Sequence, residues 1–394
     1  MSQIRIGLEN LVDSHRDLVA GQRLGLVMNQ ASVDSKFRYS CDVLAAEFPN
    51  QLTTLFSPQH GFWGEQQANM IESPDAYYKP LGLPVISLYS DTRWPSKDAL
   101  KNIDTLLIDL QDVGTRVYTF IWTMLECMKA AANFQRRVII LDRPNPIGGL
   151  DVEGPCIASG FKSFVGNAAI PMRHGLTIGE LARLLNTELG IGCELQVVPI
   201  TGWERSMLWP QTGRSWVLPS PNMPDFETSV VYPGQVMLEG TNLSEGRGTT
   251  LPFRVFGAPW LDPAELLQSL DRSRVTFPGL KLQPIHFCPT FDKYQGQTCG
   301  GLLIHVTNAD SVRSFQFTLQ ILNTIQHLPE SQLKWLPPPY EYEFVRPPID
   351  ILFGSDLLRQ MLDQDSPLDT CELNTLCDPD TIGWRNRSQP WMMY

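Results

Sequence analysis

The feature that most constrains the fold of this chain is a set of short apolar runs. Within each run, polar and apolar residues do not alternate. Five such runs occupy residues 23–30, 52–57, 84–89, 105–110 and 137–142. A strand that is apolar on both sides is typical of a parallel sheet with both faces covered. Segments with helical character lie between several of these runs. The sequence therefore predicts an α/β fold built on a doubly wound, mostly parallel sheet.

Two helix starts can be recognised from their capping residues. Thr177 is followed three residues later by Glu180, which is the pattern of a capping box. Asp262 precedes Pro263 and Glu265, so a capping acceptor stands before a proline suited to the first helical turn. We therefore expect helices directly after Thr177 and directly after Asp262.

The stretch 210–257 is rich in proline, glycine and asparagine and shows little periodicity of its own. A structureless loop of this length is unusual in a compact domain unless it carries function. Two strand-like runs and a helical segment follow it. We expect a Rossmann-like catalytic domain at 1–258, which includes this loop but has no dinucleotide site. A smaller α+β domain is expected at 259–394.

Polar residues follow the predicted strands at the points where the strands end. The segments are PQHGFWGE after 52–57, QDVGTRVY after 105–110 and RPNP after 137–142. Because ligands of open parallel sheets bind beyond the carboxyl ends of the strands, these segments predict a site at that edge. The alternative interpretation is that strand ends are polar simply because they face water.

Two further groups are candidates for the site. Residues 239–250 combine Glu239, Glu245 and Arg247 with three glycines, which allow the backbone to approach a ligand closely. Arg173 and His174 precede the capped helix, whose N-terminus favours an anion. Each group also has a structural interpretation, as a solvated turn in the first case and as a hydrogen-bonding histidine in the second.

Charge and missing motifs exclude several classes of function. The 394 residues carry a formal net charge of −11, which argues against binding to nucleic acid or to an anionic membrane. Neither GxGxxG nor GxxxxGK[ST] occurs, and neither do HExxH or CxxC spacings. We therefore expect no cofactor and no metal. The remaining carboxylates and aromatic residues permit carbohydrate cleavage without selecting it.

Several longer strings make a family recognisable. They occur in the order PQHGFWGE, DVGTRVYT, LDRPNPIGG, PMRHGLTIGELA, PSPNMP and LEGTNLSEGRGTTLPF. In this combination the chain resembles the DUF1343 family, which is represented by NamZ-like exo-β-N-acetylmuramidases. The resemblance implies a Rossmann-like domain without a dinucleotide and a smaller C-terminal domain. It also implies release of N-acetylmuramic acid from the non-reducing end of peptidoglycan fragments.

The chain departs from the family pattern at two positions. Many members have glutamate at the position of Gln59, and members commonly have arginine at the position of Trp63. An amide does not titrate, so Gln59 cannot act as an acid or a base. Either the nearby Glu65 takes over such a role, or the activity has changed, or the role belongs elsewhere in the chain.

A glycosidase needs a general acid of raised pKa and a second carboxylate. We predict Glu65 as the acid, Glu245 or Glu239 as the second carboxylate, and His60 and Asp112 as further catalytic candidates. Arg116, Arg143 or Arg247 could bind a sugar carboxylate through the planar guanidinium fork. The resemblance and these arguments predict the substrate-binding residues Gln59, Arg116, Tyr118, Arg143, Asn145, Arg173, His174, Asn222, Asn242 and Arg247.

Three alternatives to this hydrolase stay open: a lyase, a non-catalytic sugar or muropeptide-binding protein, and an enzyme that processes phosphosugars. The expected partner is a small carbohydrate or muropeptide, and the oligomeric state is open. Residues 1–25 lack the apolar core of a signal peptide, and the eight cysteines form no CxxC pair, so a cytoplasmic protein with reduced thiols is expected. The 31 prolines predict a rigid pocket built from loops. The group at 337–339 and 347–348 is interpreted as a stiff connector at the pocket's rim or as packing alone.

Overall fold

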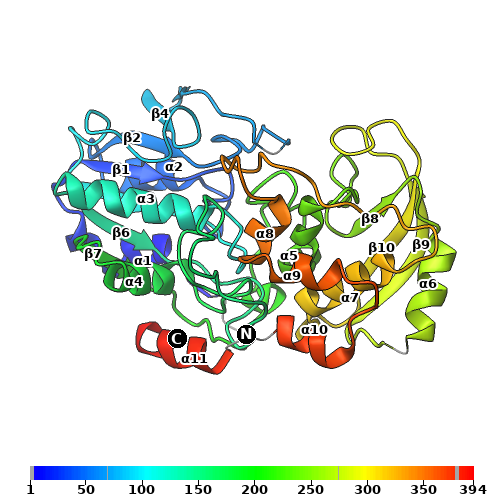
Figure 1. Ribbon diagram of the computed structural model, residues 1–394. Helices are drawn as coiled ribbons and strands as arrows, with labels where there is room; N and C mark the ends of the chain where they lie inside the picture. The colour runs from blue at the N-terminus through cyan, green and yellow to red at the C-terminus, as the bar shows by residue number, and fades with distance from the viewer. Residues whose placement is uncertain (1–3, 69, 274, 378–380) are drawn as a thin grey trace.

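The computed structural model describes residues 4–68, 70–273, 275–377 and 381–394. Within them the chain forms a seven-stranded sheet and a three-stranded sheet, each covered by helices, and Figure 1 shows the two units side by side. The predicted fold class, an α/β unit with a mostly parallel sheet followed by a smaller α+β unit, is confirmed. Among the described residues no helix is both long and apolar enough to cross a lipid bilayer.

The large sheet has the strand order β3-β4-β2-β1-β5-β6-β7. Its strands are β1 (Leu24–Val27), β2 (Leu52–Ser57), β3 (Ala76–Tyr78), β4 (Leu83–Ser87), β5 (Thr105–Ile108), β6 (Arg137–Leu141) and β7 (Leu195–Val198). All neighbours pair in parallel except β3 and β4, which pair antiparallel. The sequence did not predict β3, because this short edge strand is largely exposed and lacks an apolar run.

Helices cover both faces of the large sheet, which explains why its strands are apolar throughout. The helices α1 (Gly7–Ser14) and α2 (Ser40–Glu47) share a hydrophobic core with one face, and α3 (Phe120–Asn133) and α4 (Ile178–Glu188) share another with the opposite face. Leu106 and Ile108 of β5 belong to the core beneath α3, whereas Leu107 belongs to the core beneath α1. Successive strand residues alternate between two buried faces, so no polar alternation appears.

Both predicted helix starts are confirmed. Thr177 Oγ1 accepts a hydrogen bond from the backbone N–H of Glu180 at 3.2 Å, and the Glu180 carboxylate accepts one from the N–H of Thr177 at 3.0 Å. Asp262 Oδ1 accepts from the N–H of Ala264 at 2.7 Å and so caps α6 (Pro263–Arg272). Each cap satisfies donors that the first helical turn leaves unpaired.

The second unit is built on an antiparallel sheet of strand order β8-β10-β9. Its elements are β8 (Val255–Ala258), β9 (Leu280–Phe287), β10 (Cys299–Val306), α5 (Phe226–Gln235), α6 and α7 (Ser314–Gln326). The strand β8 precedes the expected boundary at residue 258, yet it pairs in this small sheet.

The stretch 210–257 is not structureless, which corrects the expectation of a long loop. It contains α5 and β8, and α5 includes Pro233 and Gly234, which are normally helix breakers. A Cβ atom on Gly234 would lie 1.9 Å from the carbonyl oxygen of Ser314, so only glycine lets α5 approach α7 this closely. Packing against α7 therefore overrides the weak helical propensity of this segment.

The C-terminal segment returns to the first unit. It contains α8 (Pro348–Phe353), α9 (Leu357–Leu362), α10 (Thr370–Cys377) and α11 (Thr381–Ser388), and Figure 1 shows α11 below the large sheet. The Tyr394 hydroxyl donates a hydrogen bond to Asp142 Oδ2 at 2.7 Å at the end of β6. The short 3₁₀ helices are η1 (Arg16–Leu18), η2 (Trp209–Thr212), η3 (Val236–Gly240), η4 (Ala309–Ser311) and η5 (Gln389–Trp391).

Candidate active site

A cleft opens where the two units meet. The loop after β2 and the segment before α3 supply its walls from the first unit. The region between α5 and β8 and the segment before α8 supply them from the second. Its polar and aromatic lining consists of Gln59, His60, Tyr118, Thr119, Phe120, Ser220, Asn222, Tyr232, Glu239, Arg247, Phe253, Tyr340 and Glu341. Carboxylates, an arginine and several tyrosines thus share one concave surface, which is typical of a ligand site.

Glu341 is the most perturbed carboxyl group in the cleft. Burial raises its pKa to about 7, and the negative charge of Glu239 acts in the same direction. Its carboxylate accepts hydrogen bonds from the Tyr89 hydroxyl at 2.9 Å and from Gln59 Nε2 at 3.2 Å. A carboxyl group that is half protonated near neutral pH has the property required of a general acid.

Gln59 is held in one orientation by its neighbours. The Thr119 hydroxyl donates a hydrogen bond to Gln59 Oε1 at 2.6 Å, which turns the amide nitrogen toward Glu341. Gln59 therefore positions Glu341 and does not itself transfer protons. These two hydrogen bonds therefore fix the orientation of the Gln59 amide in the cleft.

His60 lies beside Gln59 as a neutral imidazole. Burial lowers its pKa to about 4, and the nearby positive charge of Arg247 also lowers it. His60 Nδ1 lies 2.8 Å from the carbonyl oxygen of Gln66, so this nitrogen carries the proton. Nε2 is then an acceptor. The backbone of His60 has φ of +73°, a conformation that costs energy outside glycine and occurs often at functional sites.

A chain of charged groups runs from Glu239 to Lys293 within the second unit. Arg247 Nη2 lies 2.7 Å from Glu239 Oε1, and the Tyr340 hydroxyl donates to Glu239 Oε2 at 2.6 Å. Arg247 Nε lies 3.3 Å from Glu245, whose other oxygen contacts Lys293 Nζ at 2.9 Å. Lys293 and Arg247 lower the pKa of Glu245 against the opposing effect of burial. The two carboxylates hold the Arg247 guanidinium in place.

Two glycines explain why Arg247 reaches this position. Gly246 and Gly248 have φ of +80° and +76°, in the left-handed region that side chains disfavour. A Cβ atom would lie 2.5 Å from the carbonyl oxygen of Val255 at the first position and 2.6 Å from that of Phe291 at the second. The Glu-Gly-Arg-Gly sequence is therefore required for a tight loop that presents one arginine.

The structure brings six of the predicted site residues together in the cleft: Gln59, His60, Tyr118, Asn222, Glu239 and Arg247. Glu245 lies behind this surface, where it contacts Arg247 and Lys293. The other eight predicted residues lie elsewhere: Glu65, Asp112, Arg116, Arg143, Asn145, Arg173, His174 and Asn242. Among the segments that follow the predicted strands, the one after β2 contributes Gln59 and His60 to the cleft, the one after β5 contributes Tyr118, and the one after β6 contributes no lining residue.

Glu65 lies at the surface, which does not support its predicted role as the acid. Its carboxylate accepts a hydrogen bond from the backbone N–H of Trp63 at 3.0 Å and closes a local turn. The exposed Trp63 ring packs against Tyr39 and Tyr78 instead of burying the carboxylate. The burial that the prediction required is found at Glu341.

Arg116 is fully buried and bound to backbone, so it is not placed to hold a sugar carboxylate. Its Nη1 donates to the carbonyl oxygens of Pro155 and Ile170 at 2.6 and 3.2 Å. Its Nη2 donates to those of Leu352 and Phe353 in α8 at 2.6 and 3.1 Å. Burial lowers its pKa to about 10. Arg116 ties α8 to the first unit.

Five further predicted residues serve the scaffold. Asn145 donates to the Leu176 carbonyl at 3.0 Å, and Asn242 donates to the Gln332 carbonyl at 2.8 Å. Arg173 pairs with Glu153 at 2.8 Å. His174 is buried; its Nδ1 accepts from the N–H of Leu176, and its Nε2 lies 3.3 Å from Asp112 Oδ2. These contacts lie within the scaffold, and none of the five residues lines the cleft.

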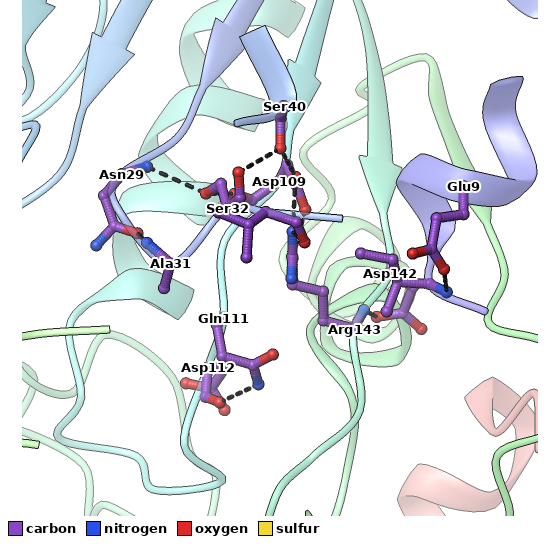
Figure 2. Close-up of polar contacts among 12 residues, drawn as sticks. Glu9, Asn29, Ala31, Ser32, Ser40, Asp109, Gln111, Asp112, Asp142 and Arg143 are labelled. Carbon is purple, nitrogen blue, oxygen red and sulfur yellow. Dashed lines mark hydrogen bonds and ion pairs between the residues drawn. The ribbon is translucent and has the colours of Figure 1, made fainter. Parts of the chain in front are cut away.

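Arg143 also lies outside the cleft. It reaches from the end of β6 to Asp109 at the end of β5, as Figure 2 shows, with Nε 2.5 Å from Oδ1 and Nη2 2.9 Å from Oδ2. It lines a second, separate cavity. Its surroundings are described below.

Sequence reasoning missed the carboxyl group that stands out most. Tyr340 and Glu341 are adjacent and lie about 250 residues after Tyr89, and none of the three belongs to a string used for the site. The signal available was the group of prolines at 337–339 and 347–348, which flanks Glu341. One of the two interpretations of that group, a stiff connector at the rim of the pocket, agrees with the position of this segment in the cleft.

Comparison with known sequences assigns the chain to a family. The profile described as exo-β-N-acetylmuramidase NamZ, N-terminal, matches residues 24–227, and the corresponding C-terminal profile matches residues 230–394. This chain belongs to the NamZ family. The two NamZ profiles together cover both units that flank the cleft. The resemblance inferred from the sequence strings is confirmed.

Individual relatives of the NamZ family agree with this assignment. The chain is 41% identical over 335 residues to the peptidoglycan β-N-acetylmuramidase NamZ of Bacillus subtilis (strain 168), covering 85% of this chain and 80% of that protein. Two crystal structures of DUF1343 family proteins from Bacteroides fragilis NCTC 9343 match with TM-scores of 0.88 and 0.76 at 31% and 27% identity. Each comparison covers 100% of this chain and 99% of the other.

Proposed function

We propose that this chain is an exo-acting glycoside hydrolase that releases terminal N-acetylmuramic acid from peptidoglycan fragments. The observation that carries the proposal is Glu341, a buried carboxyl group of raised pKa in a cleft that also holds a second carboxylate and an arginine. Membership of the NamZ family and the printed activity of the Bacillus relative support the same reaction class.

Glu341 is the general acid of this proposal. Its raised pKa keeps a large fraction protonated near neutral pH, so it can give its proton to the glycosidic oxygen as the C–O bond breaks. Gln59 and Tyr89 then stabilise the carboxylate that remains, because both donate hydrogen bonds to it. Proton transfer thus produces an anion that the site is already built to accept.

Glu239 is the second carboxylate. It lines the same cleft and faces Arg247 and Tyr340, which fix both of its oxygens. Glycoside cleavage passes through a transition state that resembles an oxocarbenium ion, and a carboxylate next to the anomeric carbon stabilises that positive charge. The ionised Glu239 and the protonated Glu341 therefore have complementary roles.

Arg247 accounts for selection of a sugar that carries a carboxylate. Nη1 and Nε of Arg247 are buried and have no hydrogen-bond partner among the described residues, although Nη2 donates to Glu239 and Nε lies 3.3 Å from Glu245 Oε1. The lactyl carboxylate of N-acetylmuramic acid is an acceptor of the required charge. Of the three arginines that the sequence proposed for this task, only Arg247 lines the cleft.

The test compares Glu341→Gln with Glu65→Gln on aryl N-acetylmuramides that have good and poor leaving groups. Removal of a general acid costs about 10²–10⁴-fold in rate. We expect a loss of this size for Glu341→Gln on the poor leaving group and a much smaller loss on the good one, which needs little protonation. Glu65→Gln, a matched change of an exposed glutamate, should retain wild-type rates on both substrates. Equal losses on both substrates would remove Glu341 from the role of acid.

A sugar-binding protein without turnover is the second candidate, because Gln59, next to the candidate acid, is an amide and cannot transfer a proton. Calorimetric titration with N-acetylmuramic acid glycosides, run alongside product analysis, separates the two candidates. Binding without product favours the binding protein. Mass spectrometry of any product distinguishes hydrolysis, which adds water, from elimination, which does not.

A further inference from the structure

A second cavity lies on the large sheet at the point where the strand order reverses. Strand β1 is flanked by β2 on one side and by β5 on the other, so successive crossovers leave β1 in opposite directions. In open α/β sheets the crevice beyond the carboxyl ends of these strands is where ligands bind. A cavity occupies this position, and none of the residues that line it lines the cleft.

Two guanidinium groups line this cavity. Arg143 is held by Asp109 and by the Val33 carbonyl, and Arg214 is held by Glu9 at 3.0 Å. Their side chains are only 3% and 6% exposed. Nη1 of Arg143 and Nε of Arg214 make no hydrogen bond to any described residue. Each arginine therefore keeps its own carboxylate and still has a donor available.

A buried acceptor stands on the same wall. Gln111 is 2% exposed, and its Nε2 donates to the carbonyl oxygens of Asp112 and Pro144 at 2.8 and 2.9 Å. These two contacts fix the orientation of the amide. Its Oε1 has no hydrogen-bond partner among the described residues. Figure 2 shows Gln111 and Arg143 on neighbouring loops at the ends of β5 and β6. A buried carbonyl oxygen without a partner is unfavourable unless a ligand or water donates to it.

The remaining wall is apolar. Val33, Phe37 and Trp209 line the cavity between the polar groups, and the exposed ring of Phe37 lies at the surface. Asp34 also lines it, but its carboxylate is taken by Arg38 at 2.7 Å and by the backbone N–H groups of Lys36 and Arg38. The cavity thus offers positively charged donors, one acceptor and a small hydrophobic surface.

We propose that this cavity binds a small carboxylate that carries a hydrogen-bond donor on the adjacent carbon. The carboxylate would accept from Arg143 Nη1 and Arg214 Nε, the neighbouring O–H or N–H would donate to Gln111 Oε1, and a short carbon chain would contact Trp209 and Val33. This chemistry is shared by a free 2-hydroxy acid and by the C-terminus of a short peptide. The site is independent of the proposed glycosidase reaction.

Calorimetric titration of the full chain tests the proposal with lactate as the free acid, dialanine as the peptide terminus, and acetate as the probe without the adjacent donor. We expect lactate or dialanine to bind with a Kd below 10 mM, and acetate about tenfold more weakly because it leaves Gln111 unpaired. Whichever of the two binds more tightly identifies the source of the carboxylate. Absence of binding by both, or equal binding of acetate, overturns the proposal.

Variants assign the binding to this cavity. Arg214→Met should weaken binding about tenfold, whereas Arg23→Met, which removes an exposed arginine outside the lining, should not change it. If Arg214→Met does not fold, Gln111→Met removes the acceptor at similar size. Binding that persists unchanged in the variant would place the acid in the cleft beside Arg247 and overturn the proposal.

Discussion

Gln59 donates a hydrogen bond from Nε2 to Oε1 of Glu341 at 3.2 Å, and this contact joins the two units across the cleft. Gln59 follows β2 in the large sheet, and Glu341 belongs to the segment before α8, 282 residues further along the chain. Thr119 fixes the direction of the contact, since its hydroxyl occupies the amide oxygen. Gln59 is therefore a direct neighbour of the candidate acid.

Replacing Gln59 by glutamate should change how the cleft titrates. Two carboxyl groups at this separation cannot both ionise easily, so the pair should share one proton and its upper apparent pKa should rise above that of Glu341 alone. We expect the loss of kcat/KM at alkaline pH to move to higher pH in Gln59→Glu. Gln67→Glu adds the same charge at an exposed neighbouring position and is the control. An alkaline limb at the wild-type pH in Gln59→Glu would contradict the coupling.

The raised pKa of Glu341 predicts a pH dependence of stability. The folded state retains the proton up to about pH 7, whereas the unfolded state loses it near the ordinary value of 4.5. The contribution of this group to the free energy of unfolding is therefore complete below pH 4.5 and is lost as the pH rises through 7. Glu341→Gln should gain stability relative to wild type, by up to about 3 kcal/mol, between these pH values.

Denaturation midpoints of wild type and Glu341→Gln at pH 4.5 and pH 8 measure this difference. Glu65→Gln is the control, because that carboxylate is exposed and closes only a local turn. A constant difference between Glu341→Gln and wild type across this range would show that Glu341 titrates as an ordinary carboxyl group.

Arg116 should affect stability and not substrate affinity. Arg116→Met removes hydrogen bonds to four buried carbonyl oxygens, two of them in α8, so we expect a loss of about 3–5 kcal/mol in the free energy of unfolding. The KM of the folded fraction should stay at the wild-type value. Arg23→Met removes an exposed ion pair with Asp104 and should leave the thermal midpoint nearly unchanged, because solvent screens such a pair. Thermal unfolding measures the stability of both variants, and steady-state kinetics measures their KM. A raised KM in Arg116→Met would indicate that Arg116 binds the substrate and would contradict the prediction.

Gly248 should control the position of Arg247. Alanine at this position would place its Cβ atom 2.6 Å from the Phe291 carbonyl oxygen, so the loop must move and take Arg247 away from Glu239. We expect the KM for N-acetylmuramides to rise at least about tenfold in Gly248→Ala, the size of one lost charge-assisted contact. Gly21→Ala is a matched control, because its φ of +72° is similar and no atom lies within 4 Å of the added Cβ.

The control variant Gly21→Ala distinguishes the effect of backbone strain at a left-handed glycine from the effect of moving the loop that carries Arg247. Gly21→Ala should lower the free energy of unfolding by about 1 kcal/mol through the left-handed conformation alone and leave kinetics unchanged. Kinetics of Gly248→Ala that match those of Gly21→Ala would mean that the loop does not position Arg247.

The sequence by itself determined the parts of the protein that depend on local chemistry. Apolar runs without polar alternation predicted a parallel sheet with both faces covered, and capping residues predicted the starts of α4 and α6. Both signals are local, because the burial pattern of a strand and the cap of a helix each depend on a few neighbouring residues. The string from Glu239 to Arg247 also carried enough local information to identify two charged residues of the cleft.

Only the tertiary structure decided which charged residues face a ligand. The sequence offered three arginines in equally suggestive strings, namely Arg116, Arg143 and Arg247. The guanidinium of Arg116 donates to four carbonyl oxygens, and that of Arg143 is paired with Asp109. Glu341 becomes an acid candidate only because Gln59, Tyr89 and Glu239 arrive from distant segments and bury it. The pKa of a carboxyl group depends on desolvation and on neighbouring charges, and both are set by the packing of the two units.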